Sequence, residues 1–154
     1  IRIYIKKNNK TKIEKSVKKM LQEEENFGIK NFKTYQKFGK KVYEIRNNVL
    51  KNIKELKENK KNIIGYGAPA KATTALNFFG ISDEIDYIIE DNKFKHNKFI
   101  PGVKIPIKNK KNVKNKKNAL LVLAWNFFED IKKNNADLSD YFVNIKDLES
   151  NNWK

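Results

Sequence analysis

Apolar residues in the first third of the chain recur every three or four positions, the period of an amphipathic helix. Two such stripes occur: Ile13, Val17, Met20 and Leu21 in the first, and Phe38, Val42, Ile45, Val49, Ile53 and Leu56 in the second. The first is bounded by a capping box of Thr11 with Glu14 and by Gly28, a residue that commonly ends helices. The pattern predicts a helix over 11–27 and a longer helix over 38–56, and both need an apolar surface to cover.

After Lys61 the period changes, and short apolar runs of strand length alternate with helical stretches. The predicted strands are residues 62–67, 85–92, 119–125 and 141–145, and the predicted helices are residues 68–80 and 127–134. The prolines of 98–107 predict an irregular crossover or an edge strand, and the lysine-rich residues 108–118 predict a solvated connection. Residues 1–5 alternate and are rich in β-formers, which predicts a short N-terminal strand.

Continuously apolar strands that alternate with helices favour a parallel sheet covered on both faces. Right-handed crossovers between such strands then give a Rossmann-like sheet. The predicted fold class is therefore α/β, a Rossmann-like and mostly parallel sheet with helices on both faces, preceded by two N-terminal helices.

The size and composition of the chain limit what it can be. Its 154 residues suit one domain, or one domain with a helical extension, and 39% hydrophobic residues are enough for a core. No run approaches the roughly 20 apolar residues that span a bilayer, and Ile1–Ile5 runs into lysines, unlike a signal peptide. We therefore expect a soluble, cytoplasmic protein with no membrane partner.

Several kinds of reactive site are excluded by residue type. The sequence has no cysteine, so it has no disulfide, thiolate metal site or cysteine nucleophile. A single histidine, His96, leaves no histidine pair for zinc, and it is interpreted as an exposed loop residue between Lys95 and Asn97. We expect no metal site and no catalytic residue in this chain.

The formal net charge of +16 suggests nucleic-acid binding, because clustered lysine and arginine neutralise phosphates. However, almost all of this charge is lysine mixed with asparagine, and only Arg2 and Arg46 are arginines. Arginine is the residue suited to bidentate recognition of bases and phosphates. The charge is therefore interpreted as tolerant surface loops, and nucleic acid is a disfavoured partner whose binding would fall steeply with salt.

A glycine turn between a predicted strand and a predicted helix is the most informative motif. It carries Gly65, Gly67 and Lys71, and such a turn allows close approach of a bound group while the helix N-terminus attracts anions. Glu90 and Asp91 end the next strand, where an acid in dinucleotide folds accepts hydrogen bonds from a ribose. The pattern indicates a phosphate or pyrophosphate site, and a tight turn without a ligand is the alternative.

Longer segments resemble a known family. They are GYGAPAKATTALNFFGI at 65–81, IDYIIEDNKFKHNKFIPGVKIPI at 85–107 and VLAWNFFEDI at 122–131. In this order they resemble the C-terminal domain of sugar C-methyltransferases, which act on nucleotide-linked keto-deoxysugars. Two positions depart from the family's pattern, because Ala72 replaces a usual glycine and Ala124 a usual proline.

The resemblance implies a domain organisation. Residues 1–10 would end a preceding S-adenosylmethionine domain, residues 11–60 would form a helical extension packed on the sheet, and residues 61–154 would form the Rossmann-like domain. It also implies a transferase of deoxysugar biosynthesis, with S-adenosylmethionine and the catalytic base held by domains outside this chain. By itself the chain would be inactive and would hold no cofactor.

The resemblance and the turn together predict residues that bind a nucleotide sugar, with deoxythymidine diphosphate as its nucleotide. They are expected at the carboxyl edge of the sheet: Gly65, Tyr66, Gly67, Ala68, Lys71, Glu90, Asp91, Asn92, Pro101, Gly102, Trp125 and Asn126. Tyr66 and Trp125 can stack on a base or sugar or fill the core, and the prolines can serve only to shape turns. A non-catalytic nucleotide- or NAD-binding module is the alternative function.

Overall fold

The computed structural model of the chain describes residues 2–7, 12–59 and 62–150. The helices and strands, in chain order, are α1 (Lys15–Phe27), α2 (Phe32–Glu58), β1 (Ile63–Tyr66), α3 (Ala70–Phe79), β2 (Ile85–Ile89), β3 (Ile107–Lys108), β4 (Ala119–Val122), α4 (Phe128–Asn134) and β5 (Tyr141–Asn144). Short 3-10 turns are η1 (Lys93–Lys95), η2 (Lys110–Asn112), η3 (Trp125–Phe127) and η4 (Asp147–Glu149).

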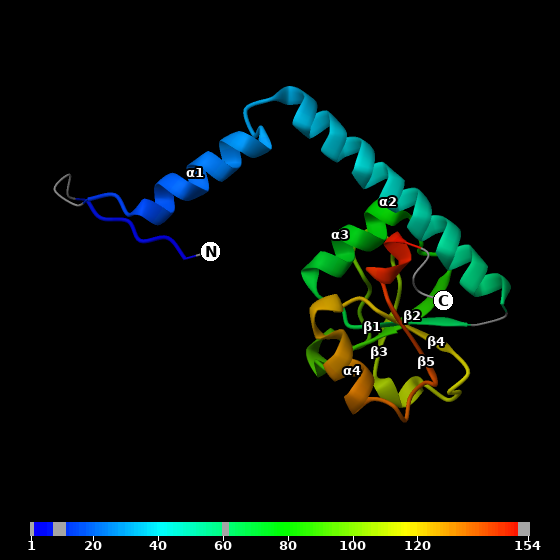
Figure 1. Cartoon of the computed structure of the whole chain (residues 1–154). Coiled ribbons are helices and arrows are strands. Elements are labelled where there is room, and N and C mark those ends of the chain that lie inside the picture. The colour runs from blue at the N-terminus through cyan, green and yellow to red at the C-terminus, as the bar shows by residue number, and fades with distance from the viewer. Residues whose placement is uncertain (1, 8–11, 60–61, 151–154) are drawn as a thin grey trace. The chain divides into compact units, whose positions relative to one another are not determined.

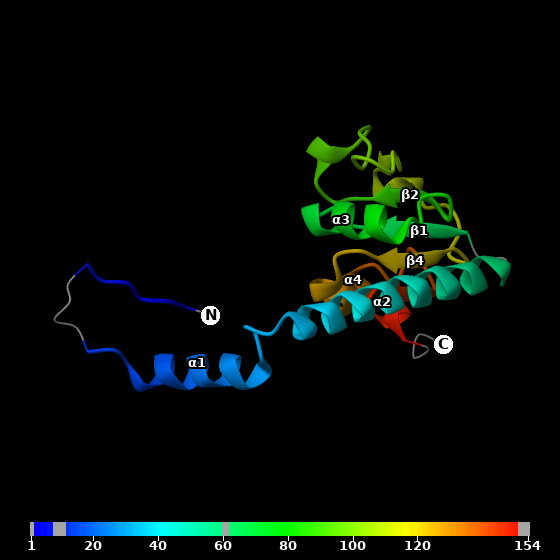
Figure 2. The same cartoon turned by 90° about the horizontal axis from the view of Figure 1, so that it is seen from above.

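The strands form one sheet in the order β3-β2-β1-β4-β5, and every pair is parallel. Figure 2 shows β2, β1 and β4 side by side in this order. The chain runs outward from β1 to β3 and then crosses back to β4, so the strand order reverses between β1 and β4. Ligands of open α/β sheets bind outside the carboxyl ends of the strands at such a switch point. The predicted Rossmann-like α/β fold is confirmed.

Each face of the sheet has its own apolar core. One face is covered by the second half of α2 and by α3, whose buried side chains include Ile53, Leu56 and Leu76. The other face is covered by α4, with Phe128 and Ile131 against the strands (Figure 1). Alternate residues of the buried strands point to opposite faces, which is why these strands are apolar throughout. Accordingly, every residue of β1 and of β4 is buried.

The chain divides into two compact units, residues 1–41 and residues 42–154, and the division falls within α2. In the larger unit, the Asn52 amide is fully buried and donates to the carbonyls of Leu148 and Ser150, at 2.9 and 3.1 Å. The Arg46 Nε donates to the Phe78 carbonyl at 2.8 Å. These contacts join α2 to η4 and to α3.

The smaller unit differs from the sequence expectations in two places. Residues 2–5 form no strand within the described part of the chain, because a single strand has no ladder to join, and Ile3 and Ile5 are exposed. The helix α1 begins at Lys15, with Glu14 as its N-cap, and Gly28 ends it in the left-handed conformation as expected. Thr11 of the proposed capping box lies outside the described residues.

The lysine-rich connection is shorter and more structured than expected. The edge strand is limited to β3, and Phe99 forms an isolated antiparallel bridge with Pro106. The segment 109–118 contains η2, and Val113 packs on the second core rather than pointing into solvent.

No helix within the described residues combines the length and the apolar character that crossing a bilayer needs.

Candidate functional site

The turn from β1 to α3 lies at the switch point and depends on a glycine. Gly67 has φ +86°, a left-handed conformation that glycine adopts without strain. A Cβ atom at this position would come within 3.0 Å of the Ala124 Cβ, so the turn passes close to the end of β4. The Gly67 amide donates to the Ile89 carbonyl at 2.8 Å, which extends the β1–β2 pairing into the turn.

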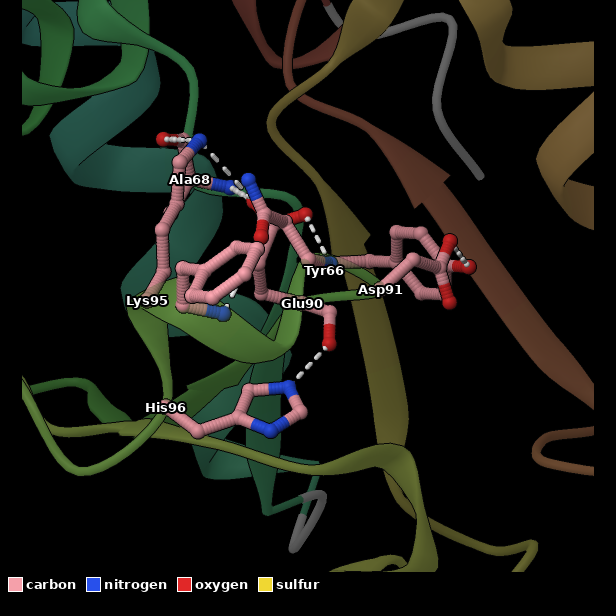
Figure 3. A network of polar contacts seen from close by, with 8 residues as sticks. Tyr66, Ala68, Glu90, Asp91, Lys95 and His96 are labelled. Atoms are coloured by element: carbon pink, nitrogen blue, oxygen red, sulfur yellow. Dashed lines mark hydrogen bonds and ion pairs between the residues drawn. The ribbon is translucent and has the colours of Figure 1, made fainter.

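The carboxylate of Glu90 holds this turn in place (Figure 3). One of its oxygens accepts from the Ala68 amide at 2.8 Å, and the other accepts from the Asn92 amide at 3.1 Å. The Lys95 ammonium donates to the Ala68 carbonyl at 2.9 Å and lies 3.4 Å from the Glu90 carboxylate. Glu90 and Lys95 therefore bind the backbone N–H and the backbone carbonyl of Ala68.

The ionisation of Glu90 follows from these contacts. Burial of the carboxyl raises its pKa, but hydrogen bonds from the Asn92 and Ala68 amides and the Lys95 ammonium outweigh burial. The net result is a pKa of Glu90 below its usual range. Both oxygens of the Glu90 carboxylate thus already accept hydrogen bonds from backbone amides of the chain, and the side chain is only 13% exposed.

A second polar group lies on the other side of β1. The Tyr66 hydroxyl donates to Asp91 at 2.7 Å and lies 3.3 Å from the Asn135 side-chain oxygen. Burial, the hydrogen bond to Asp91 and the negative charge of Asp91 raise the pKa of Tyr66 well above its usual value. Tyr66 is therefore a neutral hydrogen-bond donor at physiological pH. Asp91 is also paired with Lys110 at 3.4 Å.

The N-terminus of α3 has no side-chain cap, since its N-cap residue is Pro69. The first amides of a helix have no acceptor within the helix and attract anions. Lys71 lies in this first turn, and its ammonium is 3.8 Å from the centre of the Trp125 ring. A cation over an indole ring is held by only about 0.5–2 kcal/mol. The lysine is therefore near the helix end and weakly restrained.

Two open recesses flank Tyr66 at the carboxyl edge of the sheet. The larger has a volume of about 330 Å³, and its lining includes Tyr66, Gly67, Glu90, Asp91 and Phe127. The smaller, about 220 Å³, is lined by polar side chains and by Ile131, and it shares Tyr66, Asp91 and Ile131 with the larger. The structure thus brings together four of the predicted site residues, Tyr66, Gly67, Glu90 and Asp91, with Ala68 and Lys71 beside them.

The comparisons with known proteins agree with this architecture. The family profile described as "C-methyltransferase C-terminal domain" matches residues 1–143. The chain belongs to this family. It is also similar to the C-methyltransferase NovU of Streptomyces niveus, with 28% identity over 124 residues, or 79% of this chain and 30% of that protein. This C-methyltransferase C-terminal domain therefore spans about 30% of the length of the curated relative that it matches. The resemblance to C-methyltransferases is confirmed.

Some predicted residues of the C-methyltransferase C-terminal domain lie away from the recesses. Pro101 and Gly102 lie beside Asn77 in the last turn of α3, where the Asn77 amide donates to the Pro101 carbonyl at 2.9 Å. This places them along the flank of α3 and not at its N-terminus. The Asn92 side chain accepts from the Phe94 amide and caps η1, and Asn126 is exposed in η3.

Other residues of the candidate site were missed by the sequence analysis. Lys95, Asn135, Phe127 and Ile131 line the recesses or bind the turn. Lys95 could not be singled out because it is one of many lysines in asparagine-rich loops. The interpretation of His96 as an exposed loop residue was wrong, because its ring is part-buried and its Nε2 lies 2.7 Å from the Glu90 carbonyl oxygen.

A C-methyltransferase implies S-adenosylmethionine as the methyl donor, and the turn of this domain does not fit it. In Rossmann-like sites an acid at the end of the second strand binds the ribose hydroxyls. Here that acid is Glu90, which already accepts from two amides and contacts Lys95. An adenosine ribose would have to displace these contacts. Among the described residues, no group of three or more histidine, aspartate or glutamate side chains is placed to hold a metal.

Proposed function

We propose that this chain is the substrate-binding C-terminal domain of an S-adenosylmethionine-dependent C-methyltransferase that acts on a nucleotide-linked keto-deoxysugar. The observation that carries the proposal is the uncapped N-terminus of α3 at the switch point, with Lys71 in its first turn. Amides and a lysine converging on one point suit a diphosphate, which is the anionic part of a nucleotide sugar.

The charges around the turn favour the diphosphate on the Lys71 side of the edge. Glu90 and Asp91 line the larger recess and repel phosphate oxygens there. Within the described part of the chain, Trp125 is the one side chain that holds Lys71, and a charge-assisted bond to phosphate is stronger than a cation–π contact. A diphosphate at the end of α3 would therefore draw the ammonium away from the indole ring.

The recess beside Tyr66 suits the uncharged, hydroxyl-bearing part of the same ligand. Asp91 offers a carboxylate that is 60% exposed, and Asn134 and Asp130 line the smaller recess with it. Carboxylates and amides accept hydrogen bonds from sugar hydroxyls. In this arrangement Gly67 and Ala68 shape the turn, Glu90 positions it, and Lys71 binds the ligand.

The chemistry that the reaction needs is different from what this edge supplies. Removing a proton beside a ketone needs a base with a pKa near neutrality and a donor to the enolate oxygen. Of the groups at the edge, Glu90 has a lowered pKa and Tyr66 a raised one, so both are far from the range of a base at neutral pH. We therefore assign binding and orientation to this domain, and assign proton removal and the methyl donor to other parts of the enzyme.

Calorimetric titration of the chain tests the proposal. The chain is expected to bind deoxythymidine diphosphate glucose more tightly than NAD or S-adenosylmethionine. Lys71→Ala is expected to weaken the nucleotide sugar about tenfold or more, because a charge-assisted bond contributes about 1.5–3 kcal/mol. Lys132→Ala, an exposed lysine in the last turn of α4, is the matched control and should leave the affinity unchanged.

A fluorescence measurement reports the same event at Trp125. In a Trp153→Phe background Trp125 is the only tryptophan, since the sequence has two. Its emission should change when the ligand draws Lys71 from the ring, and Lys71→Ala should abolish that change. Tighter binding of NAD would favour the non-catalytic nucleotide-binding module, and equal affinities of the parent and Lys71→Ala would contradict the proposed site.

A further inference from the structure

The helix α1 carries an apolar stripe on its surface. Val17, Met20, Leu21 and Phe27 recur at the spacing of one helix face and are between 42% and 73% exposed. All 13 residues of the helix are exposed. An isolated helix shorter than about 12–15 residues is marginally stable in water, and packing of an apolar face supplies most of the stability of helices in proteins. We therefore expect α1 to pack against a partner surface.

The charges of α1 are ordered against the dipole of the helix. Its three lysines lie within residues 15–19, and its three glutamates are residues 23–25. The N-terminus of a helix favours negative side chains and the C-terminus favours positive ones. The order in α1 is the reverse, so it destabilises the helix when the helix stands alone. A partner that brings acidic residues to the first half and basic residues to the second half would offset this cost.

A second copy of α1 that runs antiparallel has this complementary order of charges. In a two-fold symmetric pair each contact occurs twice. An axis at Leu21, the middle residue of the helix, places Lys18 across from Glu24 of the second copy and Lys19 across from Glu23. Within one helix Lys19 and Glu23 are 3.8 Å apart, but this pair is exposed and contributes little to stability. Both side chains therefore remain available to a second copy.

The net charge of the chain also favours α1 as the place of contact. The formal net charge of +16 makes two copies of the chain repel each other. In contrast, α1 has equal numbers of lysine and glutamate, so its own side chains carry no net charge. Two copies that meet through α1 avoid this repulsion at the point of contact.

We propose that α1 joins two copies of this chain as an antiparallel, two-fold symmetric pair of helices. The inference is independent of the proposed function, because it concerns neither the carboxyl edge of the sheet nor its ligand. The helix is about 20 Å long. The contact is therefore smaller than that of permanent dimers, which commonly bury about 2,000 Å² or more. The dimer is expected to dissociate at micromolar concentrations of the chain.

Sedimentation equilibrium of the chain over a range of micromolar concentrations tests the proposal. The parent is expected to change from monomer to dimer as its concentration rises. An acidic variant, Lys18→Glu with Lys19→Glu, and a basic variant, Glu23→Lys with Glu24→Lys, each place like charges across the axis. Each variant should therefore dimerise about tenfold or more weakly than the parent.

Mixing the two variants distinguishes pairing from damage to the helix. An equimolar mixture should form a heterodimer about as tight as the parent dimer, because opposite charges again face each other. Substitutions that only weakened the helix would not be rescued in this way. The matched control is Lys132→Glu with Lys133→Glu, two exposed lysines of α4. It changes the net charge as much as the acidic variant does, and it should dimerise like the parent.

Three results would overturn the proposal. A parent that stays monomeric at every concentration would assign the apolar stripe to another part of the C-methyltransferase. A dimer that neither charge variant weakens would place the contact outside α1. A mixture of the two variants that does not associate would show that the charges of α1 do not pair across an axis.

Discussion

Gly65→Val is expected to lower the free energy of unfolding by about 3 kcal/mol, the upper end of the usual cost of overpacking a core. A Cβ atom at Gly65 would lie 2.6 Å from the Cγ1 of Ile88 and 3.2 Å from the Cδ1 of Leu123. Ile88 is fully buried and β-branched, so it has few other side-chain conformations available. The midpoint of urea unfolding, followed by circular dichroism, measures the loss.

Gly39→Ala is the matched control and should have the opposite sign. Gly39 lies within α2, and a Cβ atom there would meet nothing within 4 Å. Alanine in place of glycine inside a helix stabilises it by about 0.5–1 kcal/mol. A Gly65→Val chain as stable as its parent would show that β1 and β2 do not pack as closely as described.

Glu90→Gln is expected to destabilise the chain at neutral pH by about 1–3 kcal/mol, the range for losing hydrogen bonds of a buried charged group. Glutamine has one acceptor oxygen, whereas the carboxylate accepts from the Ala68 and Asn92 amides through two. It also lacks the charge that pairs with Lys95. The turn that carries Lys71 should loosen, so the affinity for the nucleotide sugar should fall as well.

The pH dependence of stability distinguishes the charge from the shape of this side chain. The pKa of Glu90 in the folded chain is below its ordinary value, which is about 4.3 in an unfolded chain. Its contribution is therefore fully present above about pH 5 and is lost as the pH falls through the folded-state pKa. Unfolding midpoints measured from pH 7 to pH 3 should fall more steeply for the parent than for Glu90→Gln.

Glu129→Gln is the control for this pH series. Glu129 is exposed in the first turn of α4 and has no part in the contacts of the turn. Its replacement should leave the slope of the midpoint against pH close to that of the parent. If Glu90→Gln kept the parent's acid dependence, the charge of Glu90 would not be what holds the Ala68 amide.

The arrangement of the sheet could be predicted because its signals are local. Glycine turns, continuous apolar runs and helical stripes located β1, β2, β4 and β5, and right-handed crossovers restricted their order. The limits of the elements were less well predicted. The run 119–125 was expected to be all strand, but β4 ends at Val122 and Trp125 begins η3.

The chemistry of the edge could be predicted only in part, because the partners of its groups are distant in sequence. Glu90 and Asp91 were placed correctly at the end of β2, but the amide of Ala68, 22 residues earlier, binds the Glu90 carboxylate. Likewise, Tyr66 pairs with Asn135 across 69 positions. Spacing along the chain indicates which groups meet at an edge, and packing decides which of them remain free for a ligand.

The second half of α2 has a consequence for how this domain can be isolated. Val49, Ile53 and Leu56 pack against one face of the sheet with almost no exposed surface, and the Asn52 amide donates to the Leu148 carbonyl of η4. A chain trimmed to begin at β1 would lack the helix that covers one face of the sheet and the amide that binds η4. A fragment that keeps this packing therefore starts near Val42, well ahead of the first strand.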